Sequence, residues 1–177
     1  MLEQLAEPLL SWYAEHARIL PWREEPPAYR VWVSEIMLQQ TRVEAVKPYY
    51  ERFMEALPGI RELAACPEER LLKLWEGLGY YNRARNLKKA AEILVEEYEG
   101  VMPKDYEAVL ALPGIGSYTA GAVLSIAYEK CYQAVDGTVL RVLSRVTEDD
   151  RDILKQAEKK SVATALKAVT AKKSQGT

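Results

Sequence analysis

The chain has 177 residues, of which 49% are hydrophobic and 28% charged, and its formal net charge is −2. This composition is typical of a folded globular protein and excludes a disordered one. No apolar run approaches the ~20 residues that span a bilayer, which excludes an integral membrane protein. The small net charge argues against indiscriminate nucleic-acid binding but permits a local basic face.

Helical periodicity dominates the chain, and alternating strand patterns are scarce. Proline and glycine mark the joints between the periodic segments. We expect helices at about residues 2–16, 29–40, 43–56, 60–65, 68–76, 83–99, 105–111, 117–128, 137–146 and 152–169. The predicted fold class is therefore all-α.

The segment YRVWVSEIMLQQT, residues 29–41, carries a carboxylate inside an apolar pattern. Glu35 shares its helix face with Val31 and Leu38, because residues three and four apart are neighbours on a helix. Desolvation there is expected to raise the pKa of Glu35 and to keep a proton on it at neutral pH. The alternative is a boundary glutamate paired with Arg30.

The segment WEGLGYYNRARNLKKAAEIL, residues 75–94, is a glycine-flexed loop followed by a basic helix. We expect Leu78, Tyr80 and Tyr81 to be exposed in the loop. Four basic residues open the helix: Arg83, Arg85, Lys88 and Lys89. Exposed aromatic and leucine side chains beside basic residues predict a wedge that enters unstacked DNA. The alternative is a loop packed by its tyrosines before a solvated helix.

The segment LPGIGSYTAGAVLSIAY, Leu112–Tyr128, is a tight turn that leads into an apolar helix. Gly114 and Gly116 allow positive φ and close approach of another molecule to the turn's amides. With the helix N-terminus that Ser117 opens, these amides form an anion site suited to a DNA phosphate. An ordinary helix–helix turn is the alternative.

The segment AVDGTVLRVLSRV, residues 134–146, places Asp136 directly before a helix. Its structural role is that of an N-cap, and an N-cap favours the ionised carboxylate. A protonated Glu35 and an ionised Asp136 match the general acid and the electrostatic stabiliser of glycoside hydrolysis through an oxocarbenium-like state.

The cysteine and histidine content is low. Cys66 and Cys131 have neither metal-ligand nor redox spacing and predict buried thiols in a reducing compartment. The single histidine, His16, cannot supply a histidine metal site, so no metal site is expected. The first residues carry acids where a secretory signal has positive charge, so secretion is not expected.

Together these segments resemble the helix-hairpin-helix DNA glycosylase superfamily, and more closely its MutY-type adenine DNA glycosylases. The motifs occur in the family's order: PWR at 21–23, SEIMLQQT at 34–41, GLGYYNRARNL at 77–87, LPGIGSYTAGA at 112–122 and VDGTVLRV at 135–142. The resemblance runs from Leu20 to Val146 and more weakly through residues 1–19 and 150–169.

The resemblance implies a multi-helix fold with an incomplete second lobe. Residues 1–19 would be the N-terminal helix of the second lobe. Residues 20–135 would form a six-helix-barrel-like module that holds the helix-hairpin-helix at 105–128. Residues 136–177 would hold the catalytic-aspartate helix, a partial C-terminal helix and a basic tail.

The resemblance also implies the reaction, which is removal of adenine paired with 8-oxoguanine or guanine after the base leaves the stack. Glu35 would protonate adenine at N7 and later help to activate water, Asp136 would stabilise the oxocarbenium ion, and Tyr118 would lie beside them. Related lyases such as endonuclease III carry a lysine nucleophile at the position of Tyr118, so this chain is expected to be monofunctional.

The remaining implied contacts involve the base pocket and the DNA. Arg23 and Trp22 would line the pocket of the extruded base. The implied DNA-binding residues are Gln40 and Thr41 around 8-oxoguanine, Leu78 and Tyr80 in the wedge loop, and the backbone of Gly114, Ile115 and Gly116 at a phosphate.

The sequence also departs from the family pattern. Thr138 replaces a common asparagine, and the chain has two cysteines where family members hold a [4Fe–4S] cluster with four. We therefore expect a chain truncated before the iron–sulfur region, with no cofactor of its own. We also expect the apolar face of the first helix at Leu9, Leu10 and Trp12 to be either exposed or repacked.

Its expected partner is duplex DNA with an adenine·8-oxoguanine or adenine·guanine pair, bound by a monomer in the bacterial cytoplasm or nucleoid and not by a membrane. Two alternatives to the enzyme are a truncated DNA-binding fragment with little or no turnover and a helical interaction protein that no longer binds DNA.

Overall fold

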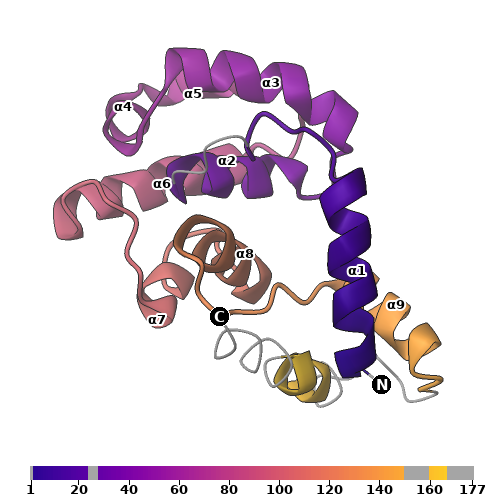
Figure 1. Cartoon of the computed structure of the whole chain (residues 1–177). Helices are drawn as coiled ribbons and strands as arrows, with labels where there is room; N and C mark the ends of the chain where they lie inside the picture. Colours follow the sequence, from indigo (N-terminus) through magenta and orange to yellow (C-terminus); the bar gives the residue numbers. More distant parts are fainter. Residues whose placement is uncertain (1, 24–27, 150–159, 167–177) are drawn as a thin grey trace. The chain divides into compact units, whose positions relative to one another are not determined.

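The structure is a computed structural model of the chain, and it describes residues 2–23, 28–149 and 160–166 (Figure 1). Its helices are α1 (Leu2–His16), α2 (Ala28–Leu38), α3 (Val43–Ala56), α4 (Ile60–Ala65), α5 (Glu68–Trp75), α6 (Asn82–Glu97), α7 (Tyr106–Leu110), α8 (Ser117–Tyr128) and α9 (Gly137–Val146). Residues 160–166 are helical as well. The described parts contain no strand, and the all-α prediction is confirmed.

The chain divides into two compact units. One unit is Leu20–Lys130, and the other is Met1–Ile19 with Cys131–Thr177. The domain bounds expected from the resemblance, at residues 19/20 and 135/136, stay predictions. Most of the helix expected at 152–169 lies outside the described residues. Nowhere in the described ranges does a helix have the length and apolarity needed to cross a membrane.

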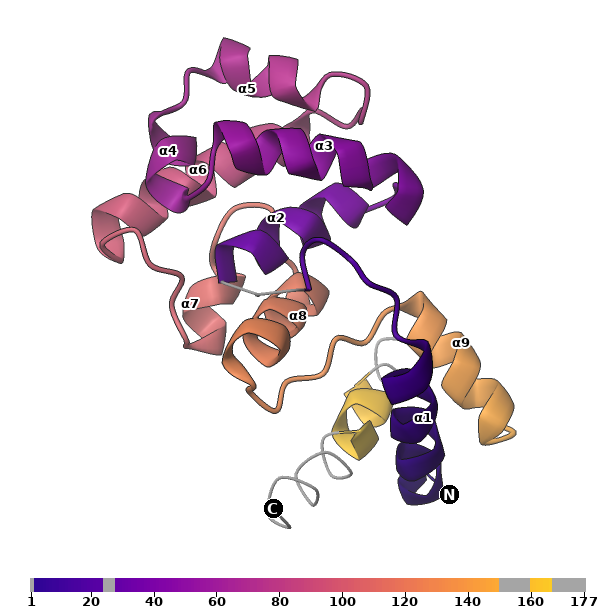
Figure 2. The same cartoon turned by 45° about the horizontal axis from the view of Figure 1, so that its top comes forward.

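Helix α2 forms the centre of the Leu20–Lys130 unit. It packs against α3, α6 and α8, and α6 in turn packs against α4 and α5. Figures 1 and 2 show α2 and α6 lying between α3, α4 and α5 on one side and α7 and α8 on the other. Only Arg30 and Leu38 among the residues of α2 are not buried, because a helix that is apolar on all sides must be covered on all sides.

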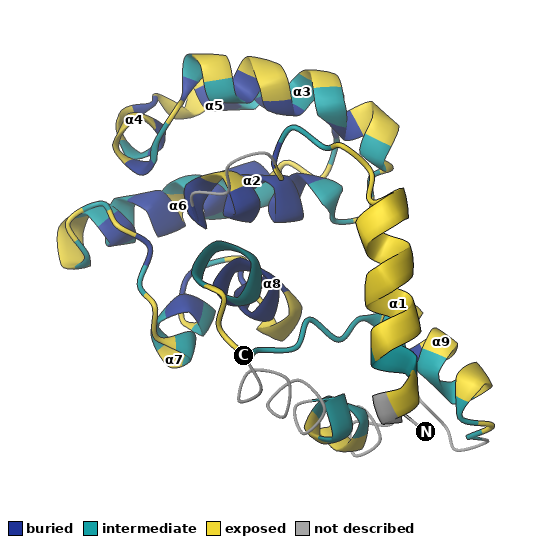
Figure 3. Ribbon diagram, viewed as in Figure 1, coloured by how far each residue is buried: buried dark blue, intermediate teal, exposed yellow. Residues whose placement is uncertain are grey.

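The unit formed by both ends of the chain leaves apolar side chains in solvent. Leu9, Leu10 and Trp12 of α1 are 62%, 54% and 56% exposed, so this apolar face is exposed rather than repacked (Figure 3). Trp12 stacks on His16 with the ring centroids 5.1 Å apart. Cys66 is buried as predicted, but the prediction for Cys131 is wrong, because this cysteine follows the end of α8 and is exposed.

Candidate active site and nucleic-acid interface

Glu35 is a buried carboxyl on the central helix α2. Glu35 is only 7% exposed, and this burial raises the pKa of its carboxyl above the ordinary glutamate value of 4.5. The charge of Arg23 and a hydrogen bond from Tyr118 oppose this rise in pKa but do not cancel it. The raised pKa predicted from the apolar helix face is therefore confirmed, and the charge acting on Glu35 is that of Arg23 rather than Arg30.

Tyr118 reaches Glu35 because α8 packs against α2. It is the second residue of α8, and its hydroxyl donates a hydrogen bond to the Glu35 carboxylate. Tyr118 is 38% exposed, so this hydrogen-bonded couple lies where the core meets solvent. Because the pKa of Glu35 is raised, the carboxyl keeps its proton to higher pH than an ordinary glutamate and can present that proton to a bound molecule.

The two residues expected in a base pocket differ in exposure. Arg23 is exposed, and its guanidinium charge acts on Glu35. Trp22 is only 2% exposed and packs edge-on against Tyr50, with 5.1 Å between the ring centroids. The Trp22 ring is thus part of the core and has almost no surface free for a base.

Asp136 caps α9 in the other unit. Its Oδ1 accepts a hydrogen bond of 2.8 Å from the amide of Val139, and the residue is half-buried. The predicted N-cap is confirmed. The Asp136 side chain therefore provides an acceptor for one of the amides at the start of α9 that have no partner within the helix.

The hairpin consists of α7, the turn at 111–116 and α8. Gly114 has φ +78°, and a Cβ at this position would lie 2.8 Å from the Cβ of Asn86. Gly116 has φ −99°, so the expected need for positive φ holds for Gly114 only. Gly116 is the N-cap of α8 and has an extended backbone conformation, which any residue can adopt.

The side chain of Ile115 is buried, and its amide donates to the Leu112 carbonyl at 3.1 Å. This amide is therefore already engaged inside the turn. The first amides of α8 have no acceptor within the helix, and Gly114 and Gly116 are exposed. The amides at the start of α8, rather than that of Ile115, are the donors best placed for an anion.

In the predicted wedge loop, Tyr80 and Tyr81 are exposed as expected and Leu78 is buried. Tyr80 is 65% exposed, whereas Leu78 is 7% exposed, so the expectation of an exposed Leu78 is wrong. Gly77 and Gly79, on either side of Leu78, have φ +103° and +69°, and the Leu78 amide donates to the Trp75 carbonyl at 3.1 Å. Gln40 is exposed and Thr41 half-buried.

The basic residues after the loop make contacts within the protein. Arg85 pairs with Glu68 at 2.9 Å, and Lys88 pairs with Glu92 at 2.8 Å. Arg83 donates to backbone carbonyls. Arg83 is half-buried, and its role as a donor to these carbonyls had no local signal in the sequence.

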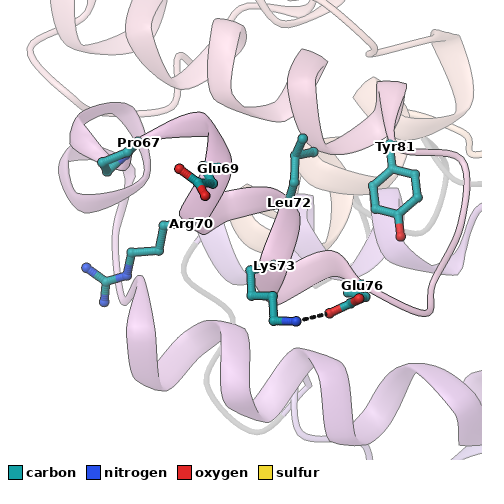
Figure 4. A pocket seen from close by; sticks show the side chains of 7 residues that line it. All are labelled: Pro67, Glu69, Arg70, Leu72, Lys73, Glu76 and Tyr81. Carbon is teal, nitrogen blue, oxygen red and sulfur yellow. Dashed lines mark hydrogen bonds and ion pairs between the residues drawn. The ribbon is translucent and has the colours of Figure 1, made fainter.

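A shallow groove of about 670 Å³ lies along α5 and Tyr81 (Figure 4). Its charged side chains are exposed, and Lys73 pairs with Glu76 across one end. It contains none of the residues predicted for catalysis. Across the described ranges, no three histidine, cysteine or acidic side chains gather as metal ligands. With two cysteines in the sequence, the chain does not fit a four-cysteine iron–sulfur cluster.

Comparison with known proteins places these features in context. The model of the HhH-GPD superfamily base excision DNA repair protein matches residues 33–170. Adenine DNA glycosylase of Mus musculus is 49% identical over 147 residues, which cover 78% of this chain and 28% of that protein. The enzyme of the same name from Buchnera aphidicola subsp. Baizongia pistaciae is 46% identical over 138 residues, which cover 77% of this chain and 39% of that protein. The chain thus spans well under half the length of these curated relatives.

Solved structures agree on the fold. A thermostable thymine-DNA glycosylase superimposes with a TM-score of 0.84 at 25% identity, covering 94% of this chain and 77% of that chain. Endonuclease III in a non-covalent DNA complex superimposes with a TM-score of 0.76 at 24% identity, covering 96% of this chain and 78% of that chain.

Proposed function

The chain belongs to the HhH-GPD superfamily of base excision DNA repair proteins, and we propose that it is a DNA glycosylase that removes adenine paired with 8-oxoguanine or guanine. The observation that carries the proposal is Glu35, a buried carboxyl whose pKa is raised and which accepts a hydrogen bond from Tyr118. Such a carboxyl retains a proton for a leaving base.

In the proposed reaction, Glu35 donates its proton to N7 of the extruded adenine. The bond between N9 and the sugar C1′ then breaks, and its electron pair moves into the protonated base. The positive charge left on the sugar is stabilised by the ionised carboxylate of Asp136, whose N-cap bond supports this role. Glu35, now ionised, takes a proton from the water that adds to C1′.

The enzyme is proposed to be monofunctional, since Tyr118 has no amine with which to form a Schiff base. Exposed Gln40 and Tyr80 are proposed to contact the DNA around the opposite base, with Thr41 beside them. Gly114 and Gly116 are proposed to admit a phosphate to the amides at the start of α8. Arg23 is proposed to border the base pocket. The proposed setting is a monomer acting in the bacterial cytoplasm or nucleoid, a choice supported by the Buchnera relative.

A single-turnover assay tests the proposal. The protein is held in excess over a duplex with one adenine opposite 8-oxoguanine, and alkali reveals abasic sites. The matched variants are Glu35→Gln and Glu55→Gln, because Glu55 is an exposed glutamate on α3. Alkali-dependent cleavage that is lost in Glu35→Gln and retained in Glu55→Gln is expected.

Equal excision by Glu35→Gln would remove that residue from the acid role. Strand cleavage without alkali, with covalent product trapped by borohydride, would contradict a monofunctional reaction. Absence of excision by a folded protein that binds the duplex in a salt-dependent way would favour the DNA-binding fragment without turnover.

A further inference from the structure

Two exposed residues of the proposed DNA interface have left-handed backbone although neither is glycine. Gln40 has φ 60° and Tyr80 has φ 48°. Gln40 occupies the position after α2 at which glycine is usual, and Tyr80 lies just before α6. A residue with a side chain keeps this conformation only where its surroundings hold it, and such residues gather at functional sites.

One guanidinium binds the backbone beside Gln40. Nη1 of Arg83 donates to the carbonyl oxygens of Ile36 and Met37, each at 3.0 Å, and also to that of Gln39. These carbonyls belong to the last turn of α2 and to the residue that follows it. Arg83 therefore caps the C-terminal carbonyls of α2, directly before the left-handed residue Gln40.

The same guanidinium binds the backbone before Tyr80. Nη2 of Arg83 donates to the carbonyl oxygens of Leu78 at 3.1 Å and Gly79 at 3.3 Å. The guanidinium carbon also lies 5.5 Å from the ring centroids of Trp75 and Tyr80. The Tyr80 ring, which is proposed to contact the DNA, therefore lies against the same guanidinium that binds the backbone before Tyr80.

Arg83 also borders the hairpin. A cavity of about 40 Å³ is lined by Arg83, Gln39, Asn86 and Gly114, among others. Asn86 stands one turn of α6 after Arg83, and its Cβ occupies the space beside Gly114. The end of α2, the loop before α6 and the hairpin turn thus meet around one side chain.

We propose that Arg83 is a positioning residue that holds Gln40 and Tyr80 in their DNA-binding arrangement. The inference rests on the proposed function, because that function assigns DNA contacts to these two residues. Lysine cannot replace Arg83, since an ammonium offers three donors from one point whereas the planar guanidinium offers five in a fixed fork.

Binding of duplex DNA with one adenine opposite 8-oxoguanine tests the role across a series of salt concentrations. Arg83→Lys is expected to raise the Kd at least tenfold and to leave the slope of log K against log salt unchanged. The matched control, Arg52→Ala, removes an exposed arginine that lies 4.7 Å from the Tyr49 ring centroid, and its Kd should stay within twofold of the unaltered chain. Arg83→Ala removes the charge altogether, so a slope smaller by about 0.9 in that variant would identify Arg83 as a phosphate contact and would overturn the proposal.

Amide hydrogen exchange of the full chain without DNA provides a second measurement. Arg83→Lys and Arg83→Ala should speed exchange at least tenfold in residues 39–41 and 78–81, but not in α3 or α8. The positioning role would be overturned if exchange became faster in only one of these two segments or in neither of them. It would also be overturned if exchange became faster throughout the Leu20–Lys130 unit. Failure of the unaltered chain to excise adenine would refute the proposed function instead, so the two failures are distinct.

Discussion

Replacing Gly114 by alanine tests how the hairpin turn is built. A side chain at φ +78° costs about 1–2 kcal/mol in the left-handed region. The new Cβ would also lie 2.8 Å from the Cβ of Asn86, and overpacking of this kind costs about 1–3 kcal/mol. We therefore expect the free energy of unfolding to fall by about 2–5 kcal/mol, which is a large share of the ~5–15 kcal/mol that holds a typical domain folded.

Gly116→Ala is the matched control in the same turn. Its φ of −99° suits any residue, and its Cβ would have no heavy atom within 4 Å. Loss of stability should not exceed about 1 kcal/mol, which is the preference for glycine over alanine at an N-cap. Because that Cβ stands at the exposed start of α8, we expect weaker binding of duplex DNA instead, by roughly tenfold in Kd if one charge-assisted hydrogen bond is lost.

Urea unfolding followed by circular dichroism measures the first effect, and fluorescence anisotropy of a labelled duplex measures the second. Asn86→Gly removes the opposing Cβ, so in the Gly114→Ala background it should recover about 1–3 kcal/mol as a coupling energy. Equal destabilisation by the two alanine variants, or no coupling between positions 86 and 114, would refute the steric reasoning.

Three further outcomes follow from Glu35, Tyr118 and the loop before α6. Since the folded-state pKa of Glu35 lies above 4.5, the folded protein binds a proton at Glu35 more tightly than the unfolded chain does. The contribution of Glu35 to the free energy of unfolding should therefore fall as pH rises from 4.5, and urea titrations of Glu35→Gln should lack this contribution. Tyr118→Phe removes a hydrogen bond that lowers the pKa of Glu35, so the alkaline limb of the single-turnover pH–rate profile should move to higher pH; a shift to lower pH would contradict the assignment. Leu78→Ala should cost about 2–4 kcal/mol of unfolding free energy because Leu78 is buried. Tyr80→Ala should change stability by less than about 0.5 kcal/mol and weaken duplex binding, and the reverse pattern would restore Leu78 as the exposed wedge.

Features that depend on neighbours along the chain could be predicted from the sequence. Helix bounds followed from periodicity and from proline and glycine at the joints, and the observed helices α3, α4, α8 and α9 begin and end at the expected residues. The burial of Glu35 followed from apolar residues three and four positions away, and the cap at Asp136 from the helix directly after it. Short-range geometry is the same in any protein, so these predictions needed no tertiary structure.

The contacts between groups distant in the sequence could not be predicted in this way. Arg83 binds carbonyls more than 40 positions earlier in the chain, and nothing in its local pattern separates it from the solvated basic residues that follow. Leu78 lies between two left-handed glycines and is buried, although its place in a glycine-flexed loop indicated exposure. The charge of Arg23 acts on Glu35, whereas Arg30, which is closer to Glu35 along the chain, does not contribute to its pKa shift. Each of these contacts depends on how separate helices pack, and packing is a property of the whole fold that no single segment contains.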